Sequence, residues 1–209
     1  MHQIIVDVAT NLGLILAIIA IGEIIARTSG IAAPTMRKFM HILTAATVIL
    51  GSLITDYHAF VIVGAIMTLG LFALRKITPL KSVTDRYNES QGEVYFALGV
   101  AITAYIAATP AIFITSITVL ALADTAAFIV GRNVASPKLT ATKSVAGTLA
   151  CLIVSVIITL TFGHPLFISL VVGIYAAAAE LLSTRGTDNA TVPALCAALL
   201  SIGLFVGLS

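Results

Sequence analysis

Charged side chains are scarce in this sequence of 209 residues, of which Asp, Glu, Lys and Arg make up 10%. Typical soluble domains carry about 25% charged residues. Hydrophobic residues reach 59%, and the mean hydropathy is +1.12. This composition excludes a soluble globular domain and predicts an integral membrane protein. The net charge of +2 gives no indication of a nucleic-acid partner.

Cysteine is scarce too, and Cys151 and Cys196 both lie in apolar segments, where a thiol usually acts as a small buried hydrophobic group. No CxxC pair and no cluster of Cys and His predicts a metal site. The N-terminal segment lacks a basic region and a small-residue cleavage site, so we interpret it as a retained first span rather than a signal peptide. An internal repeat is also lacking, which counts against a transporter built from inverted repeats.

Apolar stretches fill almost the whole chain. Each is near the length that a helix needs to cross about 30 Å of hydrocarbon. They predict one all-α, multi-pass membrane domain over residues 1–209, without a hidden soluble domain. The eight predicted spans are 4–26, 38–55, 57–74, 92–109, 111–131, 146–163, 165–183 and 191–208.

The Lys and Arg residues fall on alternate connections between these spans. The stretches "TDYH", "ATPA" and "FGHP" and both termini contain none of them. Because basic loops stay in the cytoplasm, this pattern predicts that both termini lie outside. It requires an even number of spans, so six is the main alternative to eight. The basic residues are Arg27, Arg37, Lys38, Arg75, Lys76, Lys81, Arg86, Arg132, Lys138, Lys143 and Arg185.

Carboxylates lie inside four apolar segments, near the predicted cytoplasmic end of each. A carboxylate in hydrocarbon costs several kcal/mol, so such residues usually face a bundle interior and mark function. Their similar depth predicts one recessed pocket. A local pair with Arg27, four residues later, is an alternative explanation for the first of them. The four are Glu23, Glu93, Asp124 and Glu180.

Asp124 has no basic residue one helical turn away, so a local pair does not explain it. Arg132 follows two turns later, roughly 12 Å along the axis and turned by only about 80° beyond two full turns. Both side chains are therefore expected to line one cleft.

The segment "RKFMH" places Arg37, Lys38 and His41 at the predicted cytoplasmic start of the second span. Arg37 and Lys38 are also what the positive-inside rule alone would place there. A lone interfacial His more often has a packing role. His41 nevertheless lies one turn from Arg37, and we keep it as a candidate for a catalytic role.

The fifth connection, "GRNVASPKLTATKSVAGTLA", combines basic residues, hydroxyls and glycines, a composition typical of phosphate-binding segments. Lys143, Ser144, Gly147 and Thr148 lead into the sixth span. Free N–H groups at the start of that helix are expected to hold phosphate oxygens.

The seventh connection, "ELLSTRGTDNATVP", brings Glu180, Arg185, Asp188 and Asn189 to the same face, and Pro193 is expected in the first turn of the last span. Adjacent Asp and Asn in a short loop are often turn formers. In the company of carboxylates, bases and glycines they favour a metal site. Since bases clamp nucleotide phosphates while oxygen ligands hold their Mg²⁺, the pattern predicts phosphoryl transfer from a cytosolic nucleotide to a membrane-embedded alcohol.

Five segments carry a resemblance to a known family. They are "RKFMH" at 37–41, "GEVYFALGV" at 92–100, "DTAAFIVGR" at 124–132, "KSVAGT" at 143–148, and Glu180 followed by "GTDNATVP" at 186–193. In this order they resemble the CTP-dependent polyprenol, dolichol and phytol kinases, a family that extends to CTP-dependent diacylglycerol kinases and, more distantly, CDP-lipid synthases. The resemblance implies CTP as phosphoryl donor and Mg²⁺ as cofactor.

The resemblance also implies roles for individual residues. Asp124 is implied to be a metal ligand or the base for the hydroxyl, and Glu93 to contact the lipid acceptor. The implied catalytic positions are Asp124, Lys143, Ala146 and His41. The implied nucleotide-binding residues are Arg37, Lys38, Gly131, Arg132, Lys143, Ser144, Gly147, Thr148 and Asn189. The implied metal ligands are Asp124, Glu180, Asp188 and Asn189.

Position 146 departs from the family pattern, which usually reads Lys-Ser/Thr-x-Glu-Gly-Ser/Thr. Ala146 stands where that pattern has glutamate. Either the natural protein has lost this carboxylate or the change was introduced to inactivate it, and we favour the second explanation. The chain is then expected to bind nucleotide while turning over poorly.

Other functions stay open at the level of sequence. A cytidylyltransferase that makes a CDP-lipid needs nearly the same CTP site, and a diacylglycerol kinase differs only in its acceptor. A small transporter would favour polar groups on both faces, but the outer loops offer little beyond Asp56, His58 and His164. The expected partners are CTP, a lipid alcohol and membrane lipids. A homodimer is compatible with the sequence but does not follow from it.

The predicted topology can be tested by cysteine labelling. Cysteines placed near Lys81, Lys138 and Arg185 are expected to be labelled only from the cytoplasmic side, and cysteines near His58 and His164 only from outside. Labelling of both groups from one face would contradict the eight-span topology.

Overall fold

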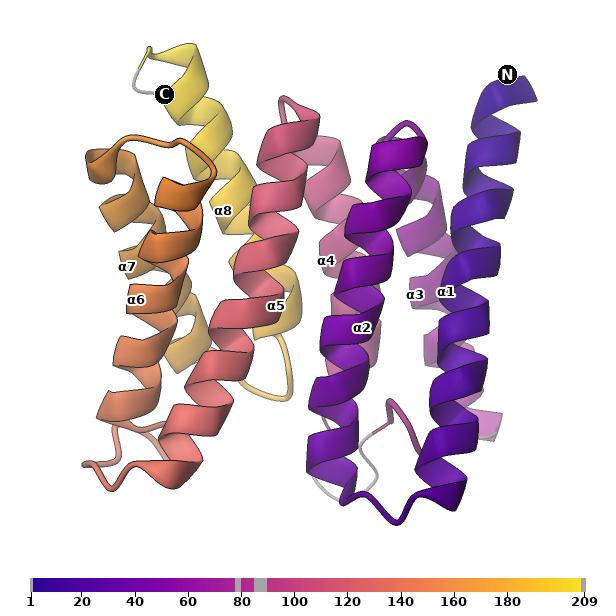
Figure 1. The fold of residues 1–209 in the computed structure, drawn as a ribbon, viewed down its shortest axis with the longest axis horizontal. Coiled ribbons are helices and arrows are strands. Elements are labelled where there is room, and N and C mark those ends of the chain that lie inside the picture. Colours follow the sequence, from indigo (N-terminus) through magenta and orange to yellow (C-terminus); the bar gives the residue numbers. More distant parts are fainter. Residues whose placement is uncertain (1, 78–79, 85–89, 208–209) are drawn as a thin grey trace. The chain divides into compact units, whose positions relative to one another are not determined.

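The computed structural model describes residues 2–77, 80–84 and 90–207, and within these ranges it contains eight α-helices and no β-strand (Figure 1). The helix positions follow the predicted apolar spans closely. The all-helical part of the prediction is therefore confirmed. The helices are α1 (His2–Thr28), α2 (Ala33–Ile54), α3 (Ala59–Ile77), α4 (Gly92–Ile106), α5 (Pro110–Asn133), α6 (Val145–Thr161), α7 (Leu166–Leu182) and α8 (Asp188–Phe205).

Four of the described helices are long and apolar enough to cross a membrane, namely α1, α2, α5 and α8. The apolar segments Ala59–Arg75, α4, α6 and α7 are shorter. The 17 residues of α6 rise about 25 Å, a little less than the roughly 30 Å of a bilayer core. The chain thus has several long apolar helices that are compatible with a membrane protein.

Hydroxyl residues cap the starts of α5 and α6, and a proline lies in the first turn of α5. Thr109 precedes α5 and its side chain accepts a hydrogen bond from the Ile112 N–H at 3.2 Å, while Pro110 occupies the first turn. Ser144 plays the same capping role for α6 through the Gly147 N–H. Such caps satisfy N–H groups that have no partner within the helix.

The start of α8 differs from the prediction. Asp188 and Asn189 were expected in a loop, but they form the first turn of the helix, and Pro193 lies in its interior rather than in its first turn. The turn that precedes the helix uses two left-handed residues, Arg185 with φ 53° and Gly186 with φ 87°. Asp188 at the helix start is favourable because a carboxylate interacts well with the positive end of the helix dipole.

Contacts between residues divide the chain into two compact units. Unit 1 comprises the residues up to Tyr105 together with the segment Thr184–Ala190, and unit 2 comprises Ile106–Ser183 and the residues from Thr191 onward. The helices α5, α6 and α7 thus lie in unit 2. The first three residues of α8 belong to unit 1, and the rest of α8 belongs to unit 2.

In unit 1, α1 packs against α2 and α3, and small residues allow close approach between helices. A Cβ atom added at Gly64 in α3 would lie 2.7 Å from the Ala97 carbonyl oxygen of α4 and 2.8 Å from the Ala101 nitrogen. Contacts of backbone with backbone through small residues are the usual way in which helices associate in membranes.

In unit 2, α6 packs against both α5 and α7. A Cβ at Gly147 in α6 would lie 2.9 Å from the Ala127 carbonyl oxygen of α5, and one at Gly173 in α7 would lie 2.5 Å from the Val156 side chain of α6. These glycines let the three helices approach closely along the face that carries the polar residues described below.

Helix α1 is fastened at both ends by polar contacts that the sequence analysis missed. Near its start, Asp7 accepts a hydrogen bond from the Asp56 N–H at 3.3 Å, and the Asn11 amide donates to the Thr55 hydroxyl at 2.7 Å. Near its end, Glu23 accepts from the Ser82 N–H at 3.0 Å. The spacing of Asp7 and Asn11 by four residues in an apolar helix is the signal that could have placed them on one face.

The close approach of α3 and α4 can be tested with two substitutions in one helix. Gly64→Ala is expected to destabilise the protein by about 1–3 kcal/mol, since its Cβ has no room beside the α4 backbone. Gly70→Ala is the control, because a Cβ there meets nothing within 4 Å, and alanine favours a helix over glycine by about 1 kcal/mol. Thermal unfolding in detergent measures both. Equal effects of the two substitutions would contradict the packing described.

Candidate functional site

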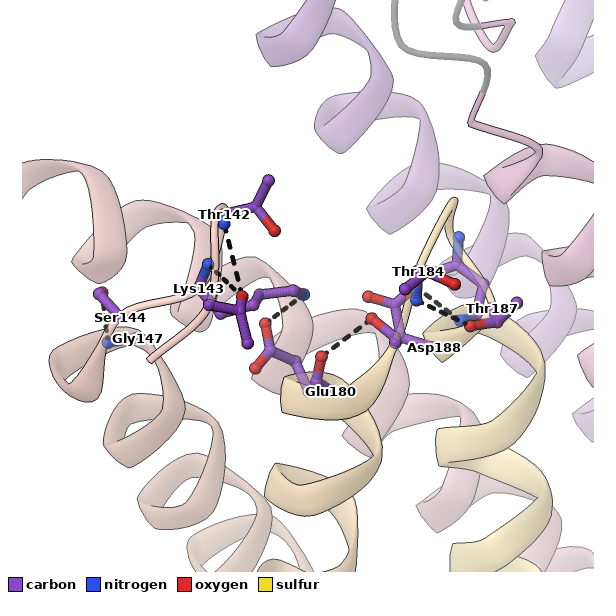
Figure 2. Close-up of polar contacts among 11 residues, drawn as sticks. Thr142, Lys143, Ser144, Gly147, Glu180, Thr184, Thr187 and Asp188 are labelled. Carbon is purple, nitrogen blue, oxygen red and sulfur yellow. Dashed lines mark hydrogen bonds and ion pairs between the residues drawn. The ribbon is translucent and has the colours of Figure 1, made fainter. Parts of the chain in front are cut away.

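Charged side chains converge in the interior of unit 2. Asp124 comes from α5 and Glu180 from α7, and both are buried, with 6% and 4% of their surfaces exposed. Lys143, at the end of the α5–α6 loop, places its Nζ atom 2.5 Å from Glu180 Oε1 (Figure 2). All three are close enough to the buried thiol of Cys151 in α6 for their charges to act on it. Three predicted site residues thus lie in unit 2, and two of them form an ion pair.

The Lys143–Glu180 ion pair is largely withdrawn from solvent. The side chain of Lys143 is 20% exposed and that of Glu180 is 5% exposed. Burial of two charges costs several kcal/mol for each ion, and removal of one partner leaves the other uncompensated. The pair therefore holds the end of the α5–α6 loop against α7 (Figure 2).

Cys151 lies within range of the charges of this cluster, although its sequence context indicated only a small buried residue. It is 1% exposed, as that interpretation expects. Its neighbours Asp124, Lys143 and Glu180 come from three separate parts of the sequence. The place of Cys151 among them follows from helix packing, and nothing in the local sequence signalled it.

The start of α6 differs from the prediction of free N–H groups. The Val145 N–H donates to the Pro137 carbonyl at 3.0 Å, and the Ala146 N–H donates to the Ser136 hydroxyl at 3.1 Å. The Gly147 N–H donates to the Ser144 hydroxyl at 3.3 Å. The α5–α6 loop folds back and supplies these acceptors itself, so the expectation of free donors at this helix start is wrong. A phosphate there would have to displace a serine hydroxyl.

Gly131 and Gly147, both predicted to contact the nucleotide, face each other across the α5–α6 contact. A Cβ at Gly147 would lie 3.3 Å from the Gly131 Cα, and a Cβ at Gly131 would lie 3.3 Å from the Ser144 hydroxyl. Both glycines therefore have a packing role in the structure. Thr148 follows on α6, with its N–H bonded to the Ser144 carbonyl at 3.0 Å.

Arg132 lies at the end of α5 with its side chain exposed. Its guanidinium carbon is 5.2 Å from the centre of the Phe128 ring, one turn earlier in the same helix. Asp124 is buried, so the structure places these two predicted neighbours in different surroundings. The cation–π contact keeps the Arg132 side chain along its own helix.

A second group of predicted residues lies in unit 1, around the start of α4. Glu93 accepts a hydrogen bond from Arg75 at 2.8 Å, and Arg37 is close enough to act on its charge. His41 of α2 packs edge-on against Phe96 of α4, with ring centres 5.1 Å apart. Glu93 is thus part of a buried ion pair, a contact that the sequence analysis did not foresee.

Asp188 and Asn189 also belong to unit 1. Asp188 is 7% exposed, and its Oδ1 atom accepts a hydrogen bond from the Asn189 N–H at 3.1 Å. The Asn189 side-chain amide donates to the Gly92 carbonyl at 2.9 Å. The start of α8 is therefore fastened to the start of α4 within this unit. Lys38 is half-buried on the first turns of α2.

Glu23 pairs with Arg27, the local partner that the sequence offered as one explanation for this carboxylate. The Arg27 Nε donates to Glu23 Oε1 at 2.7 Å, while the Ser82 N–H donates to Oε2. These two contacts account for both of its oxygens. Glu23 therefore has a structural role: it pairs with Arg27 within α1 and binds the segment 80–84.

The donor atoms in both units suit a hard cation such as Mg²⁺. Among the described residues, no group of three or more His, Cys, Asp and Glu is arranged to hold a metal ion. Mg²⁺ bound with a nucleotide usually takes only one or two carboxylates, and phosphate oxygens and water complete its octahedron. Asp124 and Glu180 offer buried carboxylates in unit 2, and Asp188 offers one in unit 1.

Comparison with known proteins identifies no relative. No family model matches the chain, and neither a curated protein nor a solved structure matches it.

The structural role of the Lys143–Glu180 pair can be tested by removing one charge or both. Lys143→Met is expected to lower the melting temperature, because it leaves Glu180 buried without this partner, at a cost of up to about 3–5 kcal/mol. The double variant Lys143→Met/Glu180→Leu is expected to recover most of that loss. Thermal unfolding of the purified protein measures both. A double variant as unstable as the single one would show that the pair does not fasten the loop.

Proposed function

We propose that this protein is a membrane lipid-alcohol kinase that transfers the γ-phosphoryl group of CTP to the hydroxyl of an isoprenoid alcohol such as a polyprenol, dolichol or phytol. The observation that carries the proposal is the Lys143–Glu180 ion pair together with the buried carboxylate of Asp124 in the same unit. Charged groups inside apolar helices are costly and usually functional. A cluster with both signs of charge suits a substrate that brings phosphates together with a cation.

The proposed step exchanges one phosphorus–oxygen bond for another. The bond between the γ-phosphorus and the oxygen that bridges it to the β-phosphate breaks, and CDP leaves with that oxygen. A new bond forms between the γ-phosphorus and the lipid hydroxyl oxygen, and the hydroxyl proton passes to a base. Asp124 is the proposed base or metal ligand, because its carboxylate lies within the apolar part of α5, where a lipid hydroxyl would enter.

Lys143 and Glu180 change partners in this proposal. Lys143 would leave Glu180 and bind a phosphate oxygen, and Glu180 would then be able to hold the cation that accompanies the phosphates. The ion pair thus holds both groups in place. Bound Mg²⁺ would neutralise phosphate charge during transfer. Lys143 and Asp124 would orient the donor and the acceptor.

The roles proposed for residues of unit 1 rest on their sequence segments alone. Arg37 and Lys38 are proposed to bind phosphates, Asp188 and Asn189 to bind the cation, and Glu93 to contact the acceptor. The exposed apolar surfaces of the helices suit an acceptor that arrives from the lipid phase, since isoprenoid chains partition there. The proposed reacting face is cytoplasmic because the basic connections carry these residues.

The proposal is tested by restoring a carboxylate at position 146. Ala146→Glu is expected to raise phosphoryl transfer to a lipid alcohol by about a hundredfold or more, which corresponds to about 2.7 kcal/mol of barrier. CTP affinity is expected to change much less, because a group that acts only in the transition state alters kcat rather than binding. Radiolabelled lipid phosphate measures the transfer.

Two further variants sharpen this test. Thr142→Glu adds the same charge at an exposed position next to Lys143 and is expected to leave turnover unchanged. Asp124→Asn in the Ala146→Glu background is expected to abolish transfer while the protein stays folded, since the amide keeps the shape and loses the charge. Unchanged turnover in Ala146→Glu with a panel of lipid alcohols, or full activity in Asp124→Asn, would contradict the proposal.

A further inference from the structure

Arg75, near the end of α3, makes two contacts with the beginning of α4. Its Nη1 atom donates to Glu93 Oε1 at 2.8 Å and to the Ser90 carbonyl oxygen at 2.6 Å. The Arg75 and Glu93 side chains are 19% and 6% exposed. A guanidinium group has donors in a fixed planar fork, so it can hold two acceptors in one geometry. Arg75 therefore fixes the first turn of α4 from both sides of Gly92.

Gly92, between these two contacts, accepts a hydrogen bond from the Asn189 amide. The distance from Asn189 Nδ2 to the Gly92 carbonyl oxygen is 2.9 Å, and a Cβ at Gly92 would lie 2.8 Å from the same nitrogen. A side-chain amide has a donor end and an acceptor end. Because the donor end is engaged by Gly92, the acceptor end, Oδ1, is turned away from it.

The Oδ1 atom of Asn189 is buried and has no hydrogen-bond partner in the part of the chain that the structure describes. A buried polar atom in this state often marks a functional group or an ion site. The neighbouring segment is held firmly as well, since the Gln91 N–H donates to the Arg185 carbonyl at 2.9 Å. An amide oxygen with a fixed direction is a suitable ligand for a hard divalent cation.

We infer that Arg75 is a positioning residue that orients the Asn189 amide oxygen toward a divalent cation. It binds Ser90 and Glu93, which flank Gly92 in the chain, and the Gly92 carbonyl accepts the hydrogen bond that sets the direction of the Asn189 amide. The inference rests on the proposed function only for the identity of the cation, the Mg²⁺ of the nucleotide. Residues that orient metal ligands commonly change metal affinity by about 10- to 100-fold when they are lost.

The test measures binding of Mn²⁺ alone to the purified protein by electron paramagnetic resonance. Arg75→Gln is expected to weaken Mn²⁺ binding about tenfold or more, and Arg75→Lys by less, because lysine keeps the charge but not the fork. Arg27→Gln is the matched control. Arg27 also pairs with a glutamate of unit 1, but its side chain is 53% exposed, and that glutamate is Glu23 of α1. This control is expected to bind Mn²⁺ as the unsubstituted protein does.

A double-mutant cycle separates positioning from general destabilisation. Asn189→Ala is expected to weaken Mn²⁺ binding, and Arg75→Gln is expected to add little in that background, because its effect passes through the same amide. Additive losses would overturn the inference, since they would mean that Arg75 acts elsewhere. Unchanged Mn²⁺ binding in Arg75→Gln, or no Mn²⁺ binding by the unsubstituted protein, would also overturn it.

The proposed function is judged separately by lipid phosphorylation in the Ala146→Glu variant. Phosphorylation together with unchanged Mn²⁺ binding in Arg75→Gln would overturn the inference and leave the kinase proposal in place. Weaker Mn²⁺ binding in Arg75→Gln, with no phosphorylation of any lipid alcohol, would support the orienting role and remove the kinase proposal.

Discussion

The Lys143–Glu180 ion pair is the interaction on which the proposed site of unit 2 depends. It joins the α5–α6 loop to α7 at 2.5 Å, among helices whose other inward-facing residues are largely apolar. Two opposite charges at such a distance attract strongly where water is excluded. To separate Lys143 from Glu180, a nucleotide would therefore have to bring a phosphate for the lysine and a cation for the glutamate. A ligand with only one of the two would leave a buried charge uncompensated.

The same constraint shapes unit 1. Asp7, Glu23 and Glu93 are all carboxylates on apolar helices, and each accepts at least one hydrogen bond from another part of the unit. A polar group in an apolar environment is costly unless it is hydrogen-bonded. These contacts tie α1 to the connections that follow α2 and α3, and they tie α3 to α4. Charged residues are rare in this sequence, and in unit 1 these three carboxylates fasten the helices to other parts of the unit.

The sequence predicted the helices well and the partners of their polar residues poorly. Length and hydropathy are properties of continuous segments, so the eight apolar runs located the eight described helices to within a few residues. The start of α8 was not predicted because Asp188 and Asn189 resemble turn formers, and the hydrogen bond from Asn189 to the distant Gly92 carbonyl is not visible in the sequence. Glu23 was resolved more easily, since its pair with Arg27 is local.

The remaining parts of the site depend on distant contacts. Ser136 bonds to the Ala146 N–H because the α5–α6 loop folds back, and no short-range pattern encodes that fold. In the sequence, Arg75 indicates only a basic connection that sets topology, whereas its contact with Glu93 joins residues 18 positions apart. Asp124 and Glu180 were singled out correctly as buried carboxylates, since a charge inside an apolar run is visible in the sequence itself.

The most direct measurement of the central claim follows the phosphorus atoms of CTP. The Ala146→Glu protein, in vesicles with a polyprenol, is incubated with CTP that carries the label either at the γ- or at the α-phosphorus. We expect the extracted lipid to carry the γ-label and not the α-label, with CDP as the other product. Label in the lipid from the α-phosphorus, with release of pyrophosphate, would show a cytidylyltransferase and contradict the account.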